Sequence, residues 1–393
     1  MRVLMVSDVY FPRVNGVSTS IETFRSTLPR YGVEVRLVVP RYGDESAAAD
    51  IVRVPGRPVP GDREDRLVGW RAMHRAVLAA AADCDLIHIQ TPFVAHYAGL
   101  AAARRLGLPV LATYHTLFEE YLQHYARWLP AGGLKAAARS FSRRQCNALD
   151  GVVVPSTAMR QRLETYGVTV PMEVLPTGIP TARFAHGEGQ VFRARHGIAP
   201  TRPVALFVGR VAHEKNIGFL LDALVHAHRV CPEILLVIAG EGPALGDLRQ
   251  QAAALCIADA VQFIGYLDRQ RELPNCYAAA DAFVFASRTE TQGLVLLEAM
   301  AAGLPVIALA EMGTIDILAP GRGAFCPPDD PQAFGQAMGQ ILGHRGAWRH
   351  LAEEAPGYAQ EWSDSAMAER LAALYRQAAA LKIGQKMLST ATV

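Results

Sequence analysis

The sequence has 393 residues, of which 51% are hydrophobic and 19% are charged, with a formal net charge of +2 at pH 7. This composition excludes a disordered chain, and the length predicts two domains rather than one. No apolar run is long enough to span a membrane, and the start MRVLMVSDVY is typical of a strand rather than a signal peptide. We therefore expect a cytoplasmic protein. Its six cysteines lack C-x-x-C spacing, which predicts neither a zinc site nor a disulfide framework.

The first half of the chain alternates short β-branched runs with helical patterns. Strands are expected at RVLMVSD, VEVRLVVP, DLIHIQ and PVLATYH, and helices over 17–30, near 66–82 and near 95–106. Such alternation predicts β-α-β units, and hence a parallel sheet covered by helices on both faces. The fold class is therefore α/β and Rossmann-like.

The same rhythm restarts after a stretch marked by proline and glycine near residue 180. The expected strands there are PVALFVGR, ILLVIAGEG, VQFIGY, AFVFAS and PVIALA. We predict one domain over 1–180 and a second over 181–357, followed by a final segment, 358–393, whose helical pattern fits against either domain. Two such sheets leave a central cleft at the carboxyl ends of their strands, where ligands bind.

The stretch TETQGLVLLEAMAAGLPV (289–306) follows a buried strand and predicts a helix from Gly293 to Ala302. Gln292, Gly293 and Leu294 then lie at the helix N-terminus, whose free N–H groups suit an anion such as a diphosphate. Glycine lets that anion approach the backbone closely.

Two glutamates flank this helix start. Glu290 is expected in the loop above the strand, and Glu298 inside an otherwise apolar helix, where a carboxylate needs a partner. Ribose hydroxyls would supply that partner, and so would a structural arginine. For Glu290 the alternative is an ordinary solvated surface position.

A second loop in the same half, FVGRVAHEKN (207–216), offers Arg210 and Lys215. A guanidinium can hold phosphate oxygens in a bidentate fork and an ammonium adds a point charge, so the pair can neutralise a departing diphosphate. Solvated loop positions are the alternative for both.

In the first half, Gly16 joins strand one to helix one, where a glycine permits close approach of a phosphate or simply allows a turn. His115 in TYHT follows a strand and is a candidate hydrogen-bond donor or acid/base, or a structural histidine. Asp83-Cys84-Asp85 is interpreted as a helix-to-strand turn rather than a metal motif, and GEGPALG (240–246) as a strand-to-helix turn rather than a dinucleotide fingerprint.

Taken together, GRVAHEKN and TETQGLVLLEAMAAGLPVIA resemble the donor half of the retaining glycosyltransferases of family 4, with their E-x7-E motif. The resemblance extends to the N-terminal glycine loop, TYHT and IAGEGP. It implies the GT-B fold, with two Rossmann-like domains facing a central cleft, the second holding the nucleotide sugar, and a C-terminal helix that returns to the first.

The resemblance also implies roles for single residues. Glu298 would bind the ribose hydroxyls, and Glu290 those of the transferred sugar. Arg210 and Lys215 would neutralise the diphosphate, while His115 would face the sugar. Two further expected contacts are Gly16 with the diphosphate and the backbone of Tyr266 and Leu267 with the base.

Two positions depart from the family pattern, namely Asn15 in place of a glycine and Pro180 in place of an aspartate. Family logic gives front-face attack by the acceptor, retention of anomeric configuration and no need for a metal ion or other cofactor. UDP-glucose is the first expected donor, with GDP-mannose or UDP-galactose next.

The acceptor hypothesis rests on residues 113–144. From Tyr121 to Leu149 the sequence has no acidic residue, and the basic residues there include Arg127, Lys135, Arg139, Arg143 and Arg144. An apolar, aromatic companion surface is supplied by Phe118, Tyr121, Tyr125, Trp128 and Leu129. This combination suits an anionic membrane surface, unless the aromatic residues are core. The segments TYHTLFEEYLQHY and IHIQTPF also resemble those of bacterial diacylglycerol glucosyltransferases. This resemblance implies a lipid acceptor and peripheral association with the inner face of the membrane.

Other functions stay open. A soluble or polyprenyl-linked glycan is the alternative acceptor, and a non-catalytic protein that binds nucleotide sugars is a further alternative. A phosphorylase is disfavoured because no lysine motif for pyridoxal phosphate is found. An NAD-linked enzyme is disfavoured because the first strand-to-helix turn lacks the glycine fingerprint. No nucleic-acid partner is expected.

Overall fold

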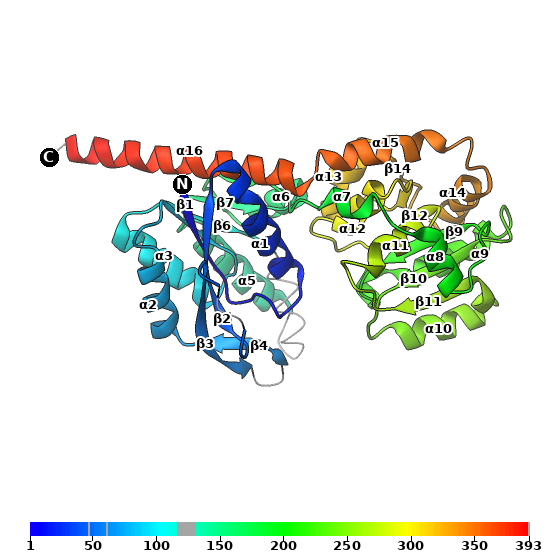
Figure 1. Ribbon diagram of the computed structural model, residues 1–393, viewed down its shortest axis with the longest axis horizontal. Coiled ribbons are helices and arrows are strands. Elements are labelled where there is room, and N and C mark those ends of the chain that lie inside the picture. Colours follow the sequence, from blue (N-terminus) through cyan, green and yellow to red (C-terminus); the bar gives the residue numbers. More distant parts are fainter. Residues whose placement is uncertain (46–47, 60–61, 116–130, 392–393) are drawn as a thin grey trace. The chain divides into compact units, whose positions relative to one another are not determined.

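The computed structural model describes residues 1–45, 48–59, 62–115 and 131–391. The chain forms two compact units, Met1–Gly178 with Asp364–Val393, and Ile179–Ser363 (Figure 1). The second unit therefore extends six residues beyond the predicted limit of 357. The prediction of two parallel α/β sheets is confirmed.

The first unit is built on an eight-stranded sheet in the order β4-β3-β2-β1-β5-β6-β7-β8. All neighbours are parallel except β3 and β4. Its strands are β1 Arg2–Val6, β2 Glu34–Arg41, β3 Ile51–Val59, β4 Asp62–Val68, β5 Leu86–Ile89, β6 Val110–Thr113, β7 Gly151–Val154 and β8 Met172–Val174. Its α-helices are α1 Gly16–Thr27, α2 Trp70–Ala80, α3 Val94–Leu106, α5 Ala131–Cys146, α6 Thr157–Thr165 and α16 Asp364–Ala391.

The β3–β4 pair corrects the sequence prediction. A helix was expected from about residue 66, but β4 continues to Val68 and α2 begins at Trp70. The sequence of β3, IVRVPGRPV, contains two prolines and a glycine, which disguise a strand, and β4 is mostly charged. β4 is the edge strand, and β3 pairs with β2 through residues 51–55 and with β4 through residues 56–59. Each part of this pair therefore has a partner on one side only, which tolerates prolines and charged residues.

The second unit has a fully parallel six-stranded sheet in the order β11-β10-β9-β12-β13-β14. The strands are β9 Val204–Val208, β10 Leu235–Ala239, β11 Val261–Gly265, β12 Ala282–Phe285, β13 Val306–Ala308 and β14 Ala324–Phe325. The α-helices are α7 Thr181–Phe184, α8 Gly189–Arg195, α9 Ile217–Ala227, α10 Leu245–Ala254, α11 Glu272–Ala278, α12 Leu294–Ala301, α13 Ile315–Leu318, α14 Pro331–Gly343 and α15 Arg349–Gln360.

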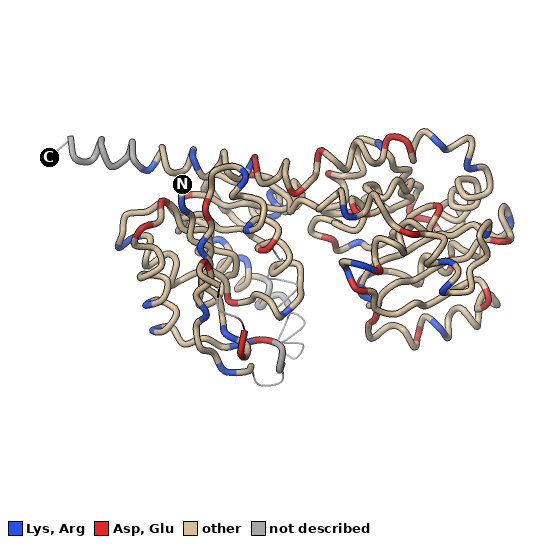
Figure 2. Tube along the Cα trace, viewed as in Figure 1, with Lys and Arg blue, Asp and Glu red and all other residues tan. Residues whose placement is uncertain are grey.

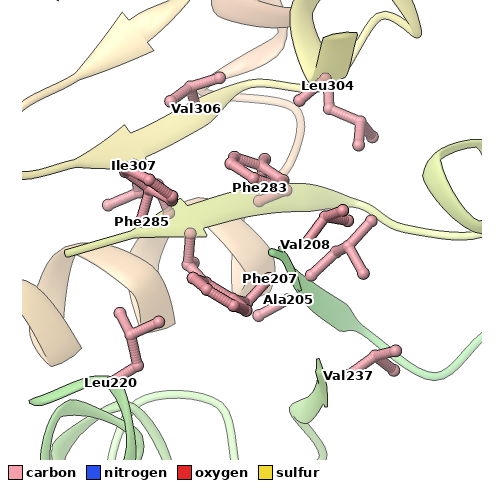
Figure 3. Close-up of a cluster of buried hydrophobic side chains, with 14 of the residues drawn as sticks. Ala205, Phe207, Val208, Leu220, Val237, Phe283, Phe285, Leu304, Val306 and Ile307 are labelled. Carbon is pink, nitrogen blue, oxygen red and sulfur yellow. The ribbon is translucent and has the colours of Figure 1, made fainter. Parts of the chain in front are cut away.

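The core of the second unit is centred on the adjacent strands β9 and β12. Phe207 stacks on Phe285 with ring centroids 5.9 Å apart, and Phe285 on Phe283 at 6.1 Å, as Figure 3 illustrates. All three rings are buried. A strand covered on both faces in this way reads as a continuous apolar run, which is why these strands were recognisable in the sequence.

The helix α16 packs on the first unit through Met367, Leu371 and Tyr375. Tyr375 is also part of a buried polar network. Its hydroxyl lies 2.6 Å from Nδ1 of His88 on β5, and Nε2 of His88 lies 2.8 Å from Oγ1 of Thr113 on β6. Burial lowers the pKa of His88 to about 3. The histidine is therefore neutral and hydrogen-bonded on both ring nitrogens.

We expect the free energy of unfolding to fall as the pH is lowered from 6.5 to 5. Burial lowers the pKa of His88 to about 3 and those of His96 and His115 to about 4, so the unfolded chain takes up protons that the folded one does not. Each such proton contributes a slope of about 1.4 kcal/mol per pH unit. Burial raises the pKa of Asp8 to about 6, so this carboxylate takes up a proton in the folded state and opposes the loss of stability. One such group is outweighed by the three histidines.

Urea unfolding at both pH values measures the effect. His88→Gln should reduce the pH dependence, whereas the same change at the exposed His350 should not. Equal stability at pH 6.5 and 5 would contradict the prediction.

Candidate active site

The start of α12 has the geometry that the sequence predicts. Gly293 is the N-cap residue with φ +89°, and the preceding Gln292 is buried. A Cβ on Gly293 would lie 3.0 Å from Cγ2 of Thr314, so glycine is required both by its backbone conformation and by the space. The N-terminus of a helix carries the positive end of the helix dipole, which favours an anion.

A neighbouring turn, which sequence reasoning missed, fixes this segment in place. The amide of Gly313 donates to the carbonyl oxygen of Glu290 at 2.9 Å, and a Cβ on Gly313 would lie 2.0 Å from the carbonyl oxygen of Thr291. The backbone at 290–291 and that at 313 are therefore in direct contact. The only available signal was a glycine shortly after the strand PVIALA.

Lys215 and Glu290 form an ion pair, although 75 residues separate them in the sequence. Their side chains are about one-fifth exposed. Lys215 ends a short 3-10 helix, and the following Asn216, at φ +53°, donates its side-chain amide to the carbonyl oxygen of Ala286 at 3.1 Å. This bond ties the Lys215 loop to the end of β12.

Arg210 does not share in that pair. Its guanidinium forms an ion pair with Glu214, and its side chain is 61% exposed. The loop that holds it packs against the GEGPALG turn, because the amide of Val211 donates to the carbonyl oxygen of Glu241 at 2.9 Å. A Cβ on Gly240 would lie 1.9 Å from the carbonyl oxygen of Gly209. Gly240 and Gly242 of this turn are thus explained by close packing between two loops.

Glu298 is 2% exposed, and each of its carboxylate oxygens has one partner in the structure. Arg269 forms an ion pair with its Oε1, and the Tyr277 hydroxyl donates to its Oε2 at 2.9 Å. Of the two partners that the sequence suggested for Glu298, ribose hydroxyls or a structural arginine, the structure shows the arginine. Tyr266 and Leu267 lie on the same loop as Arg269, the first highly exposed and the second partly buried.

In the first unit, His115 lies just after β6 and contacts Oε1 of Gln90 through Nε2 at 3.0 Å. Since burial lowers its pKa to about 4, the ring is neutral near pH 7. Gly16 opens α1, and a Cβ there would meet no atom within 4 Å. Packing within this unit therefore does not require glycine at position 16.

Asn15, which departs from the family pattern, has a clear local role. Its side chain accepts from the amide of Ser18 at 2.8 Å, while Ser18 Oγ accepts from the amide of Asn15 at 2.9 Å. This reciprocal pair is a capping box that satisfies the free donors at the start of α1.

Asp8 is a further, partly buried group that sequence reasoning missed. It follows β1 and accepts from Thr91 Oγ1 at 2.8 Å and from the amide of Ala95 at 3.0 Å, so it anchors the start of α3. Burial raises its pKa to about 6. The sequence feature that could have identified Asp8 is an acidic residue shortly after an apolar strand.

Among the residues that the structure describes, no group of three histidine, cysteine, aspartate or glutamate side chains could hold a metal ion. Asp83 instead forms ion pairs with Arg2 and with Arg36, and its Oδ1 lies 2.7 Å from Nη1 of Arg36. It lies between α2 and β5, which confirms the interpretation as a turn.

Comparison with known proteins gives consistent matches. Residues 190–358 match the model of the group 1 glycosyl transferases, and residues 14–183 that of Glycosyltransferase Family 4. The chain is 36% identical to the alpha-monoglucosyldiacylglycerol synthase of Streptococcus pneumoniae, over 78% of this chain and 71% of that protein. It is 30% identical to a GDP-mannose-dependent alpha-mannosyltransferase of Mycobacterium tuberculosis, over 84% of each chain.

Among solved structures, that of Anabaena Alr3699/HepE in complex with UDP has a TM-score of 0.76 at 17% identity. The match covers 96% of this chain and 100% of the other. Such a likeness concerns the fold, and it confirms the predicted GT-B fold.

We expect Gly293→Ala to destabilise the second unit by about 1–2 kcal/mol, because alanine at a positive φ is strained and its Cβ would press on Thr314. Urea unfolding would measure the loss. Gly246→Ala in α10 is the matched control, since its Cβ would meet nothing within 4 Å, and it should be neutral or slightly stabilising. Equal effects of the two substitutions would contradict the assigned strain.

Proposed function

Because the chain belongs to glycosyltransferase family 4, we propose that it is a retaining enzyme that moves glucose from UDP-glucose to a membrane lipid such as diacylglycerol. The observation that carries this proposal is the likeness to the pneumococcal protein, whose name describes synthesis of monoglucosyldiacylglycerol. The arrangement of the second unit supports it, because a helix N-terminus, a lysine and two glutamates gather at one edge of the sheet.

On this proposal the second unit holds the donor. Glu298 binds the ribose hydroxyls and Glu290 those of glucose, while the backbone of the 266–267 segment meets the base. The diphosphate lies at Gln292, Gly293 and Leu294, where the positive end of the helix dipole favours an anion. Gly16 of the first unit, which packing leaves open, is a further diphosphate contact.

The chemistry depends on stabilising charge. As the bond between the anomeric carbon and the phosphate oxygen stretches, negative charge grows on the diphosphate and positive charge on the sugar. Lys215 and Arg210 neutralise the diphosphate, which makes a metal ion unnecessary. The acceptor hydroxyl attacks the face that the diphosphate leaves and gives its proton to a phosphate oxygen, so the anomeric configuration is retained.

His115 contributes a hydrogen bond rather than a proton. With a pKa of about 4 the imidazole is neutral at the pH of the cytoplasm, so it is poorly suited to act as a general acid. A neutral ring donates from one nitrogen and accepts at the other. We assign it to a hydroxyl of the transferred sugar.

A second candidate is mannosyl transfer from GDP-mannose to a glycan acceptor, soluble or polyprenyl-linked. The likeness to the mycobacterial GDP-mannose-dependent enzyme favours it. A nucleotide-sugar-binding protein without turnover is the remaining alternative. Incubation with each donor, with diacylglycerol vesicles or soluble glycans and with EDTA, separates these functions through the free nucleoside diphosphate and the product formed. Transfer only to a soluble glycan, or activity that returns only with magnesium or manganese, would overturn the corresponding part of the proposal.

The two glutamates should separate binding from turnover. We expect Glu298→Ala to weaken UDP binding at least about tenfold, since a site built to hydrogen-bond a hydroxyl loses affinity without its acceptor. Glu290→Ala should mainly lower kcat. Calorimetric titration with UDP and steady-state kinetics measure the two effects, and unchanged UDP affinity in Glu298→Ala would refute the ribose assignment.

Peripheral membrane association is also part of the proposal. Of the stretch that suggested it, 113–144, residues 116–130 lie outside the described residues, and with them Phe118, Tyr121, Tyr125, Arg127, Trp128 and Leu129. Within them, no helix has the length and apolarity needed to cross a bilayer. The side chain of Leu67, shortly before α2, and that of Trp70, the first residue of α2, are exposed. The helix also carries Arg71 and Arg75 and no acidic residue. Figure 2 shows basic segments along α2. Exposed aromatic and basic side chains together suit an anionic bilayer.

We expect the triple variant Trp70→Ala, Arg71→Ala, Arg75→Ala to bind anionic vesicles at least about tenfold more weakly, because each basic residue near such a surface contributes about 1 kcal/mol. Co-sedimentation with vesicles of graded anionic-lipid content measures this. Arg104→Ala with Arg105→Ala, on exposed residues at the end of α3, is the control for charge alone. Equal losses in both variants would argue against a surface at α2.

A further inference from the structure

Glu298 is a charged group in surroundings that do not favour charge. Its neighbours Leu297, Ala299 and Met300 on α12 are fully buried. A buried carboxylate is stable only when paired and hydrogen-bonded. Among the described residues, the cation in contact with it is Arg269, which reaches it from another part of the chain.

Arg269 lies on the loop between β11 and α11, which the neighbouring acidic residues fold. The Asp268 carboxylate accepts from the amides of Gln270 and Arg271, at 3.1 and 2.9 Å, and the Glu272 carboxylate accepts from the amide of Asp268 at 3.2 Å. Both acidic groups thus bond to the loop backbone. The guanidinium of Arg269 extends to Glu298, whose negative charge raises the pKa of the arginine. The Arg269 side chain is 41% exposed.

The two partners of Glu298 occupy different oxygens. Arg269 contacts Oε1, and the hydroxyl of Tyr277 donates to Oε2 at 2.9 Å. Since each carboxylate oxygen can accept two hydrogen bonds, one acceptor position remains on each. A pair of adjacent hydroxyls, such as the 2′ and 3′ hydroxyls of a ribose, has the matching chemistry.

We infer that Arg269 is a positioning residue of the nucleotide site. It holds the Glu298 carboxylate so that the free acceptor position of each oxygen is presented to the ribose, and it fixes the 266–271 loop to α12. The base-contacting loop and the ribose-binding carboxylate are thereby set relative to each other within one unit. This inference rests on the proposed function, because it takes the ribose assignment of Glu298 as its premise.

Titration calorimetry with UDP and 2′-deoxy-UDP tests this role. Arg269→Ala should lower UDP affinity at least about tenfold and reduce the preference for UDP over its 2′-deoxy form, since Glu298 is no longer held. Arg269→Lys should recover most of the affinity, because it restores a cation. Arg271→Ala removes a charge from the same loop at an exposed position and should stay within about twofold of the parent protein.

Urea unfolding provides a readout that needs no ligand. Arg269→Ala leaves a buried carboxylate without its cation, so it should be less stable than the double variant Arg269→Ala, Glu298→Gln, in which that charge is removed. Equal stability, together with unchanged affinity and unchanged discrimination in Arg269→Ala, would overturn the inference. So would an equal loss in Arg271→Ala, or a parent protein that binds UDP and 2′-deoxy-UDP equally.

The outcomes separate this inference from the proposed function. If the variants behave as expected but no hexose reaches a lipid, the acceptor assignment alone fails. If the parent protein transfers glucose to diacylglycerol while Arg269→Ala binds UDP normally, the positioning role alone fails.

Discussion

A parallel sheet collects all of its strand-to-helix turns at one edge, and the site in the second unit depends on that constraint. The turns after β9, β10, β12 and β13 lie close enough for their backbones to hydrogen-bond directly, as Val211 does with Glu241 and Gly313 with Glu290. Such contact leaves no room for a Cβ, so glycines at 240 and 313 are required by packing. Because these loops pack so closely, they hold their polar side chains at fixed positions.

The charges of this site are already paired before any ligand enters. Lys215 is bound to Glu290, Arg210 to Glu214 and Arg269 to Glu298. On the proposed function, a diphosphate that binds here would exchange one anionic partner of a cation for another. The three pairs differ in burial, and the Arg210 pair is the most exposed. On the same proposal, the contact at Arg210 would therefore be the easiest to exchange.

Local patterns in the sequence predicted what depends on local physics. The buried strands, the start of α12 and its two glutamates could be recognised because apolar runs, glycine and an isolated carboxylate each have a direct structural cause. The β3–β4 pair was missed because prolines, a glycine and charged residues disguise its strands. The Gly313 turn and Arg269 were missed because each depends on a partner distant in the sequence. Lys215 and Glu290 were proposed for one site, but their direct pairing became evident only in the structure. The functional roles of these residues stay predictions.

The first unit is assembled from both ends of the chain, whereas the second is one continuous segment. On the ribosome, residues 179–363 emerge before Asp364, so the second unit can fold while the first still lacks its last helix. Until α16 emerges, His88 has no Tyr375 to bond, and the apolar surface that Met367 and Leu371 cover is open to water. The N-terminal part of the chain is thus made first and finished last, and a nascent chain truncated before α16 would expose this surface to chaperones.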